Sequence, residues 1–210
     1  MAEISAAQVK QLRDKTGAGM MDCKKALEEA GGDLGEAEVV LRKKGIASAA
    51  KRQSRAARQG AIGTYIHPGS QLGVMIEVNC ETDFVSRTDK FQDLVKDLAM
   101  QVAAADPKYL RREEVPAEVL EKEKEIAAQR ARNEGKPDKV IDKIVEGRLA
   151  KFFEETCLVD QPFIKDNTMT VEQLLKSQIS AMQENMQIAR FVRFKVGEAA
   201  AAAAEEPAAE

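Results

Sequence analysis

The residues best placed to do chemistry form a short polar turn after a strand-like run. Leu72–Val78 consists of strand-forming residues and stops at Asn79, and the turn Thr82–Val85 follows. In this turn Asp83 and Phe84 place a carboxylate beside a large aromatic ring. A phenylalanine in a polar turn either folds back into the core or stays outside for a partner. The second alternative predicts a contact site.

Groups that would support catalysis are scarce. His67 is the only histidine, and it stands beside Pro68 in a predicted turn. At such a position we expect a water-exposed loop residue rather than a catalytic base. No Gly-Lys-Ser or Gly-Lys-Thr phosphate loop is present, and Gly17–Gly19 is too short for a dinucleotide-binding motif. The acidic residues mostly stand among lysines and arginines, as on solvated helix faces. We therefore expect no enzyme, no catalytic residue and no cofactor.

The cysteines do not suggest a metal or redox site. Cys23, Cys80 and Cys157 are odd in number and far apart, without the close pairs that zinc sites and redox motifs use. Thiol redox activity would need such a pair. We expect buried or idle thiols and no metal ligands.

The composition is typical of a soluble globular protein with a helical bias. Of 210 residues, 44% are hydrophobic and 32% charged, and the net charge of −3 gives no overall attraction to a nucleic acid or a membrane. No apolar run reaches the roughly 20 residues that a bilayer crossing needs, and Met1–Ser5 lacks a basic region followed by an apolar one. These features predict a cytoplasmic protein with no membrane partner and no direct nucleic-acid partner.

Residues 1–45 are predicted to form a docking module of three short helices. Ser5 and Gln8 form a capping box at the first helix start, and Thr16–Gly19 interrupts the apolar pattern before a second helix from about Met21. Asp33 opens a third helix, which is expected to end before Gly45. So small a unit buries little surface, which favours contact over catalysis.

Residues 46–59 are predicted to be a basic linker that is partly helical. It is rich in alanine and carries Lys51, Arg52, Arg55 and Arg58 with no acid among them. Its cations could contact phosphates, but four charges on a solvated tether more often provide solubility and spacing.

Residues 60–197 are predicted to form an α+β core. Gly60–Ile66 and Leu72–Val78 form a hairpin, and the alternation around Val192–Val196 predicts a third strand of a small antiparallel three-stranded sheet. Helices pack against this sheet, the first of them capped by Thr88, and the charged segment 116–153 forms a projecting helical hairpin. The tail, residues 198–210, is mostly alanine and glutamate and is expected to be disordered.

Three segments resemble the elongation factor Ts family. Val9–Arg13 followed by Thr16–Leu27 is similar to the family's first signature, and Glu77–Val85 is similar to its second. Leu158–Asp166, which contains Asp160-Gln161-Pro162-Phe163, also resembles that family. The similarity covers nearly the whole chain except the tail, although longer relatives carry two copies of the core subdomain where this chain has room for one.

The resemblance implies a guanine-nucleotide exchange factor for elongation factor Tu, with a UBA-like helical module and a core built on an antiparallel sheet. It implies that the module docks on the nucleotide-binding domain of the GTPase, and that the turn disturbs the GTPase's magnesium site with Asp83 and Phe84 as the intruding pair. The partner-binding residues that it implies are Leu12, Met20, Met21, Thr82, Asp83, Phe84 and Val85.

Several alternatives stay open at this point. Asp83 could be a helix or turn cap as well as a contact, and of Met20 and Met21 we expect one to point inward and one outward. Because a three-stranded sheet leaves open edges, pairing of two chains through the core is also a hypothesis. The runner-up function is an RNA-binding or ribosome-associated protein that uses the basic linker, which a steep salt dependence of RNA binding would reveal.

Overall fold

The computed structural model describes residues 4–198, without the side chains of Ile46 and Ser48. Of the tail that was predicted to be disordered, residues 199–210 lie outside this range. The chain divides into two compact units. Of the described residues, the first contains 4–61, Val78–Gln92 and Glu172–Gln187, and the second contains Ile62–Glu77, Asp93–Val171 and 188–198.

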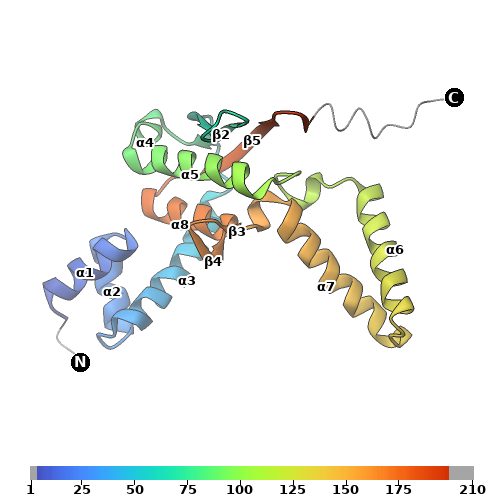
Figure 1. Cartoon of the computed structure of the whole chain (residues 1–210). Coiled ribbons are helices and arrows are strands. Elements are labelled where there is room, and N and C mark those ends of the chain that lie inside the picture. The colour runs from blue at the N-terminus through green and yellow to red at the C-terminus, as the bar shows by residue number, and fades with distance from the viewer. Residues whose placement is uncertain (1–3, 199–210) are drawn as a thin grey trace. The chain divides into compact units, whose positions relative to one another are not determined.

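The predicted helical module is confirmed as three helices, drawn in blue in Figure 1: α1 (Ala6–Thr16), α2 (Met20–Glu29) and α3 (Leu34–Arg52). The capping box is present, with Gln8 N donating to Ser5 Oγ at 3.2 Å and Ser5 N donating to Gln8 Oε1 at 3.0 Å. The side chains that form the core of the module are Val9, Leu12, Cys23, Ala26, Leu27, Ala30, Ala37 and Leu41.

Two helix boundaries differ from the prediction. Helix α2 begins at Met20, and α3 does not end before Gly45 but runs to Arg52. Alanine is the best helix former, so the alanine-rich segment after Gly45 offsets the cost of one glycine. The first half of the predicted linker is therefore helical, and Asp33 caps α3 by accepting from Glu36 N at 2.7 Å. The likeness of the module to UBA domains stays a prediction.

Within the described residues, the predicted antiparallel three-stranded sheet is confirmed, with the order β1-β2-β5. Its strands are β1 (Gln59–Ile66), β2 (Leu72–Cys80) and β5 (Met186–Lys195). The turn between β1 and β2 is closed by His67 N, which donates to Leu72 O at 2.8 Å. Strands β1 and β2 extend beyond the predicted ends, and β5 begins earlier than the predicted alternation and ends one residue before Val196, because sequence patterns locate strand boundaries poorly.

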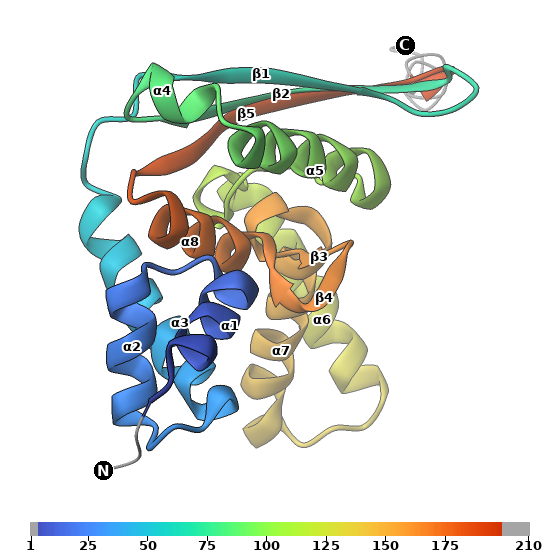
Figure 2. The same cartoon turned by 90° about the vertical axis from the view of Figure 1, so that its left-hand side faces the viewer.

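One face of the sheet is covered by α5 (Asp89–Ala105), as predicted (Figure 2). A Cβ atom added to Gly63 of β1 would lie 2.3 Å from Val95 Cγ1 of α5, so only glycine allows this approach. Thr88 caps the helix, since Phe91 N donates to Thr88 Oγ1 at 3.3 Å.

The predicted helical hairpin is confirmed as α6 (Ala117–Asn133) and α7 (Asp138–Thr156), which meet at the turn that follows α6 (Figure 1). Single-turn helices precede and follow it: η1 (Arg112–Glu114) and η2 (Leu158–Asp160). A short pair of strands was not predicted: β3 (Pro162–Phe163) and β4 (Asp166–Thr170). Two residues are too short a run for an alternation signal.

The remaining helices are α4 (Asp83–Ser86), which occupies the predicted turn, and α8 (Val171–Met182). The order of helices and strands confirms the α+β class. No helix in the described range is long and apolar enough to span a membrane.

Candidate functional site

The turn after β2 is a single helical turn that begins at a threonine cap. Thr82 has an extended backbone, and its Oγ1 accepts from Val85 N at 3.4 Å, which starts α4. Ser86 Oγ donates to Asp83 O at 2.9 Å and closes the turn from the other end. These local bonds shape the segment that carries the candidate contact residues.

Phe84 points away from the protein. Its side chain is 81% exposed, while Thr82, Asp83 and Val85 are partly buried and Ser86 is buried. An exposed phenylalanine ring costs hydration free energy that its burial against a partner would recover. The alternative in which Phe84 folds back into the core is thus excluded.

Asp83 is not the cap of α4, because Thr82 has that role and Asp83 is the first residue of the helix. The Asp83 carboxylate pairs with Arg87 across one helical turn at 3.0 Å, and although Asp83 as a whole residue is partly buried, 48% of its side chain is exposed. Exposed pairs of this kind contribute at most about 1 kcal/mol. The carboxylate therefore remains available to a partner.

Cys80 lies beneath the turn as a protonated thiol. Its Sγ donates to Thr82 O at 3.1 Å, and burial, with the nearby Glu184 carboxylate, raises the pKa of the thiol to about 11. Cys23 and Cys157 are also buried, and burial raises the pKa of both. The expectation of buried thiols is confirmed, and none of the three is activated as a nucleophile.

A second segment, distant in sequence, bonds to the turn. Glu184 accepts from Thr82 Oγ1 at 2.6 Å and from Thr82 N at 3.0 Å, and Asn185 N donates to Glu81 Oε1 at 2.6 Å. The sequence did not point to Glu184 or Asn185, because they follow α8 without any motif of their own. Only the fold brings them to the turn.

The helical module presents two methionines. Met20 is 46% exposed and Met21 is 65% exposed, so the expectation that one of them points inward is wrong. Both stand in the first turn of α2, before the residues Cys23, Ala26 and Leu27 that fill the core. Leu12 is fully buried in that core, so it shapes this surface from beneath and contributes no exposed contact.

The profile of the family described as Elongation factor TS matches residues 2–198, nearly the whole chain. The chain belongs to the elongation factor Ts family. Elongation factor Ts of Solibacter usitatus is 64% identical over all of both chains. The proteins of the same name from Geobacter sulfurreducens and Anaeromyxobacter sp. strain Fw109-5 are 58% and 57% identical over 93% and 94% of this chain and 90% of their own length.

The third segment similar to the elongation factor Ts family is a structural element. Gln161 is buried, and its Oε1 accepts from Gln101 Nε2 at 3.2 Å while its Nε2 donates to Glu155 O at 3.1 Å. Asp160 accepts from Arg112 Nη2 at 2.6 Å. The bonds of Gln161 satisfy buried polar groups, and the pair of Asp160 with Arg112 adds a contact at η2, so this segment stabilises the fold.

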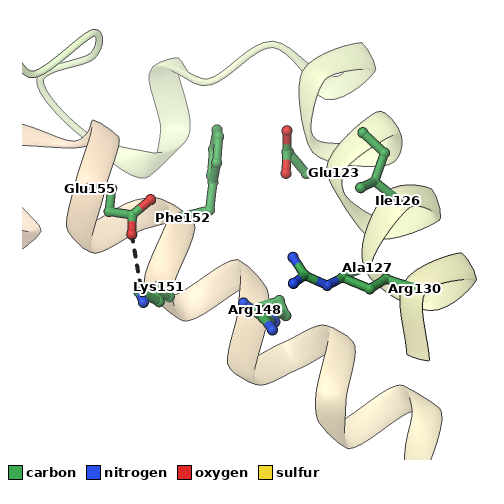
Figure 3. A pocket seen from close by; sticks show the side chains of 8 residues that line it. All are labelled: Glu123, Ile126, Ala127, Arg130, Arg148, Lys151, Phe152 and Glu155. Atoms are coloured by element: carbon green, nitrogen blue, oxygen red, sulfur yellow. Dashed lines mark ion pairs between the residues drawn. The ribbon is translucent and has the colours of Figure 1, made fainter. Parts of the chain in front are cut away.

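Between α6 and α7 lies an open groove with a volume of about 180 Å³. Figure 3 shows Arg130 of α6 reaching toward α7, and the pair Lys151 and Glu155 at 3.9 Å on α7. Charges of both signs mix with apolar side chains there, without histidine or cysteine. Both helices contribute charges of both signs to the groove, which is open to solvent. Its lining is Glu123, Ile126, Ala127, Arg130, Arg148, Lys151, Phe152 and Glu155.

Proposed function

We propose that this protein is a guanine-nucleotide exchange factor that acts by binding rather than by catalysis. It binds elongation factor Tu with GDP, disturbs the magnesium site of that GTPase and promotes GDP release during translation elongation in the cytoplasm. The observation that carries the proposal is Phe84, 81% exposed on a hydrogen-bonded turn, in a member of the elongation factor Ts family. Thr82, Asp83 and Val85 complete the contact.

The chemistry of bound GDP makes this mechanism effective. GDP is held with a magnesium ion, and Mg²⁺ demands nearly ideal octahedral geometry with short ligand distances. A ring inserted beside the site need shift the surrounding helices only slightly to misplace a ligand. Because Asp83 stands beside Phe84, the same insertion brings a negative charge close to the phosphates and competes for the cation.

Exchange follows as competition between two ligands. By linkage, the factor by which this protein weakens GDP binding equals the factor by which GDP weakens binding of this protein. The contacts of Phe84 must therefore be better in the nucleotide-free form of the GTPase than in the GDP form. A contact that is equal in both forms would bind tightly without releasing nucleotide.

The helical module supplies a second contact through Met20 and Met21. Thioether side chains are flexible and adapt to an apolar surface, and both are exposed on α2. Two contacts on one chain raise the effective concentration of the second once the first has formed. The module then holds the GTPase while the turn acts on the nucleotide site.

The experiment is release of fluorescent GDP from elongation factor Tu, with and without this protein, over a range of salt concentrations. The proposal predicts accelerated release and complex formation that tolerates salt, because apolar contacts are not screened. No acceleration at saturating protein would overturn it. Retention on RNA that falls steeply with salt, without accelerated release, would favour the alternative of an RNA-binding protein.

We also propose that two copies of the chain pair through the uncovered face of the sheet. Apolar side chains from three adjacent strands are exposed on the face opposite Gly63 and α5. A patch of this kind marks an interaction site, and a two-fold contact places the same patch on both partners. At its edge Arg190 pairs with Glu77 at 2.8 Å, and such a pair can meet its own copy across a two-fold axis. The exposed side chains are Ile62, Ile66, Met75, Val192 and Phe194.

Light scattering over a range of concentrations tests the pairing. The wild-type protein should approach twice the mass of the chain, and Phe194→Glu combined with Met75→Glu should remain a monomer. Val140→Glu, at an exposed valine on α7, is the matched control and should dimerise like the wild type. A wild-type monomer at high concentration would remove the hypothesis.

A further inference from the structure

The turn that carries Phe84 is too short to hold its own shape. Helix α4 has four residues, and a helix of one turn is unstable alone, because nucleation fixes several dihedral angles for one hydrogen bond. The exposed ring itself makes little contact that could fix the turn. Its orientation must therefore come from bonds to another part of the first unit.

Glu184 supplies those bonds from 102 positions along the chain. One carboxylate oxygen accepts from Thr82 Oγ1 at 2.6 Å, and the other accepts from Thr82 N at 3.0 Å. Bonds to an ionised acceptor are short and stronger than neutral ones. Since Thr82 is also the cap of α4, fixing this one residue fixes the start of the helix.

The residue that follows Glu184 is buried and hydrogen-bonded to three other residues. Asn185 is 2% exposed, its Nδ2 donates to Arg55 O at 2.6 Å and to Gln53 O at 3.3 Å, and its backbone N donates to Glu81 Oε1 at 2.6 Å. Glu81 precedes Thr82, and Glu184 precedes Asn185, so the two segments bond through two neighbouring pairs: Asn185 donates to Glu81, and Thr82 donates to Glu184. The carboxylate of Glu184 thus starts from a fixed backbone.

We propose that Glu184 is a positioning residue for nucleotide exchange: its bidentate contact with Thr82 holds α4 so that Phe84 is presented to the GTPase in a single orientation. This inference rests on the proposed exchange function and adds the residue that prepares the turn for it. When the ring is already oriented, less of the binding free energy is lost in ordering it. More of the binding free energy is then available to displace groups at the nucleotide site.

A positioning role differs from a purely structural one in how Glu184 and Phe84 depend on each other. If Glu184 acts through the ring, its loss matters only while the ring is present. If Glu184 merely stabilises the fold, its loss has the same effect whether residue 84 is phenylalanine or alanine. Phe84 is 81% exposed, so Phe84→Ala leaves the fold intact and allows the comparison.

The test is a double-mutant cycle on stimulated GDP release from elongation factor Tu, well below the unfolding temperature. Glu184→Ala should lower the maximal release rate about tenfold, which is about 1.4 kcal/mol. In the Phe84→Ala background the same change should lower the rate less than about twofold, since the coupled part is then absent. Glu184→Gln keeps one acceptor oxygen and should restore most of the rate.

Two further measurements complete the experiment. Glu172→Ala, which removes an exposed carboxylate of α8 paired with Lys176, is the matched control and should release GDP like the wild type. Amide hydrogen exchange of Thr82 should speed up in Glu184→Ala, a readout that does not depend on the GTPase. Should Glu184→Ala fail to fold, Glu184→Asp replaces it in the double-mutant cycle. Glu184→Asp keeps the charge, but its carboxylate lies one methylene farther from Thr82.

The outcomes separate the two claims. Additive effects of Glu184→Ala and Phe84→Ala, or a wild-type rate for Glu184→Ala, would overturn the positioning role while wild-type acceleration still supports the exchange function. Absence of acceleration by the wild-type protein would remove both.

Discussion

Phe84 and Ser86 stand two positions apart on the same helical turn and face opposite ways. Phe84 is 81% exposed and Ser86 is 7% exposed. On this short helix the small Ser86 side chain faces inward and closes the turn, and Phe84, the largest side chain of the helix, faces outward. This division between a part that anchors and a part that contacts underlies the predictions that follow.

Replacing both exposed methionines of α2 should weaken binding of the GTPase without unfolding the module. Met20→Gln with Met21→Gln removes apolar contact area at the proposed docking surface, and we expect binding about tenfold weaker, or about 1.4 kcal/mol. The midpoint of thermal unfolding should remain that of the wild type, because neither side chain is buried. Titration calorimetry and a thermal melt measure the two quantities.

Leu12→Ala provides the opposite pattern. Leu12 is fully buried in the module, so its truncation should destabilise the module by about 2–5 kcal/mol through the cavity that it leaves. Binding of the GTPase should then fall only to the extent that the module unfolds. Weaker binding by a stable, fully folded Leu12→Ala protein would instead show that Leu12 contacts the partner directly.

Asp83 should matter for exchange and hardly at all for stability. Asp83→Asn removes the charge and the pair with Arg87, an exposed pair worth at most about 1 kcal/mol. We expect slower stimulated GDP release with an unchanged melting curve. Arg87→Gln breaks the same ion pair but keeps the Asp83 charge, so it should release GDP at nearly the wild-type rate. Equal slowing by both variants would assign the effect to the ion pair.

The Cys80 thiol should make the protein less stable at alkaline pH. Its pKa rises from 9.0 to about 11 on folding, so the folded state binds the proton more tightly than the unfolded state. The stabilising contribution is complete below about pH 9 and is lost as the pH rises toward 11. Urea unfolding at several pH values should show a fall on the order of 2–3 kcal/mol that Cys80→Ala lacks. A difference between the two proteins that does not vary with pH would contradict this.

Local signals in the sequence were sufficient for most elements. Ser5 and Gln8 predict the start of the first helix, and the alternation around Val192 predicts the last strand. Both signals depend only on residues that are close in sequence. Gly45 predicts the end of α3, whereas the alanines after it continue the helix to Arg52. Residue types alone do not say which of two opposed propensities prevails.

The exposure of Phe84 could be predicted from the sequence, but the bonds that support its turn could not. Phe84 stands out as an aromatic residue in a polar segment, and its exposure agrees with that interpretation. Glu184 is one of many glutamates, and no pattern in the residues around it predicts a contact with Thr82. A contact between residues 102 positions apart is a property of the folded chain. The exposure of both Met20 and Met21 likewise depends on how α2 packs in the module.

The most direct test of the exposed ring is the maximal rate of GDP release from elongation factor Tu at saturating wild-type or Phe84→Ala protein. Burying one phenylalanine is worth about 1.5–3 kcal/mol, or about one to two decades at about 1.4 kcal/mol per decade. We therefore predict release about 10- to 100-fold slower with Phe84→Ala and an unchanged free energy of unfolding. A wild-type rate, or a loss of stability above about 3 kcal/mol that marks a core residue, would contradict the account.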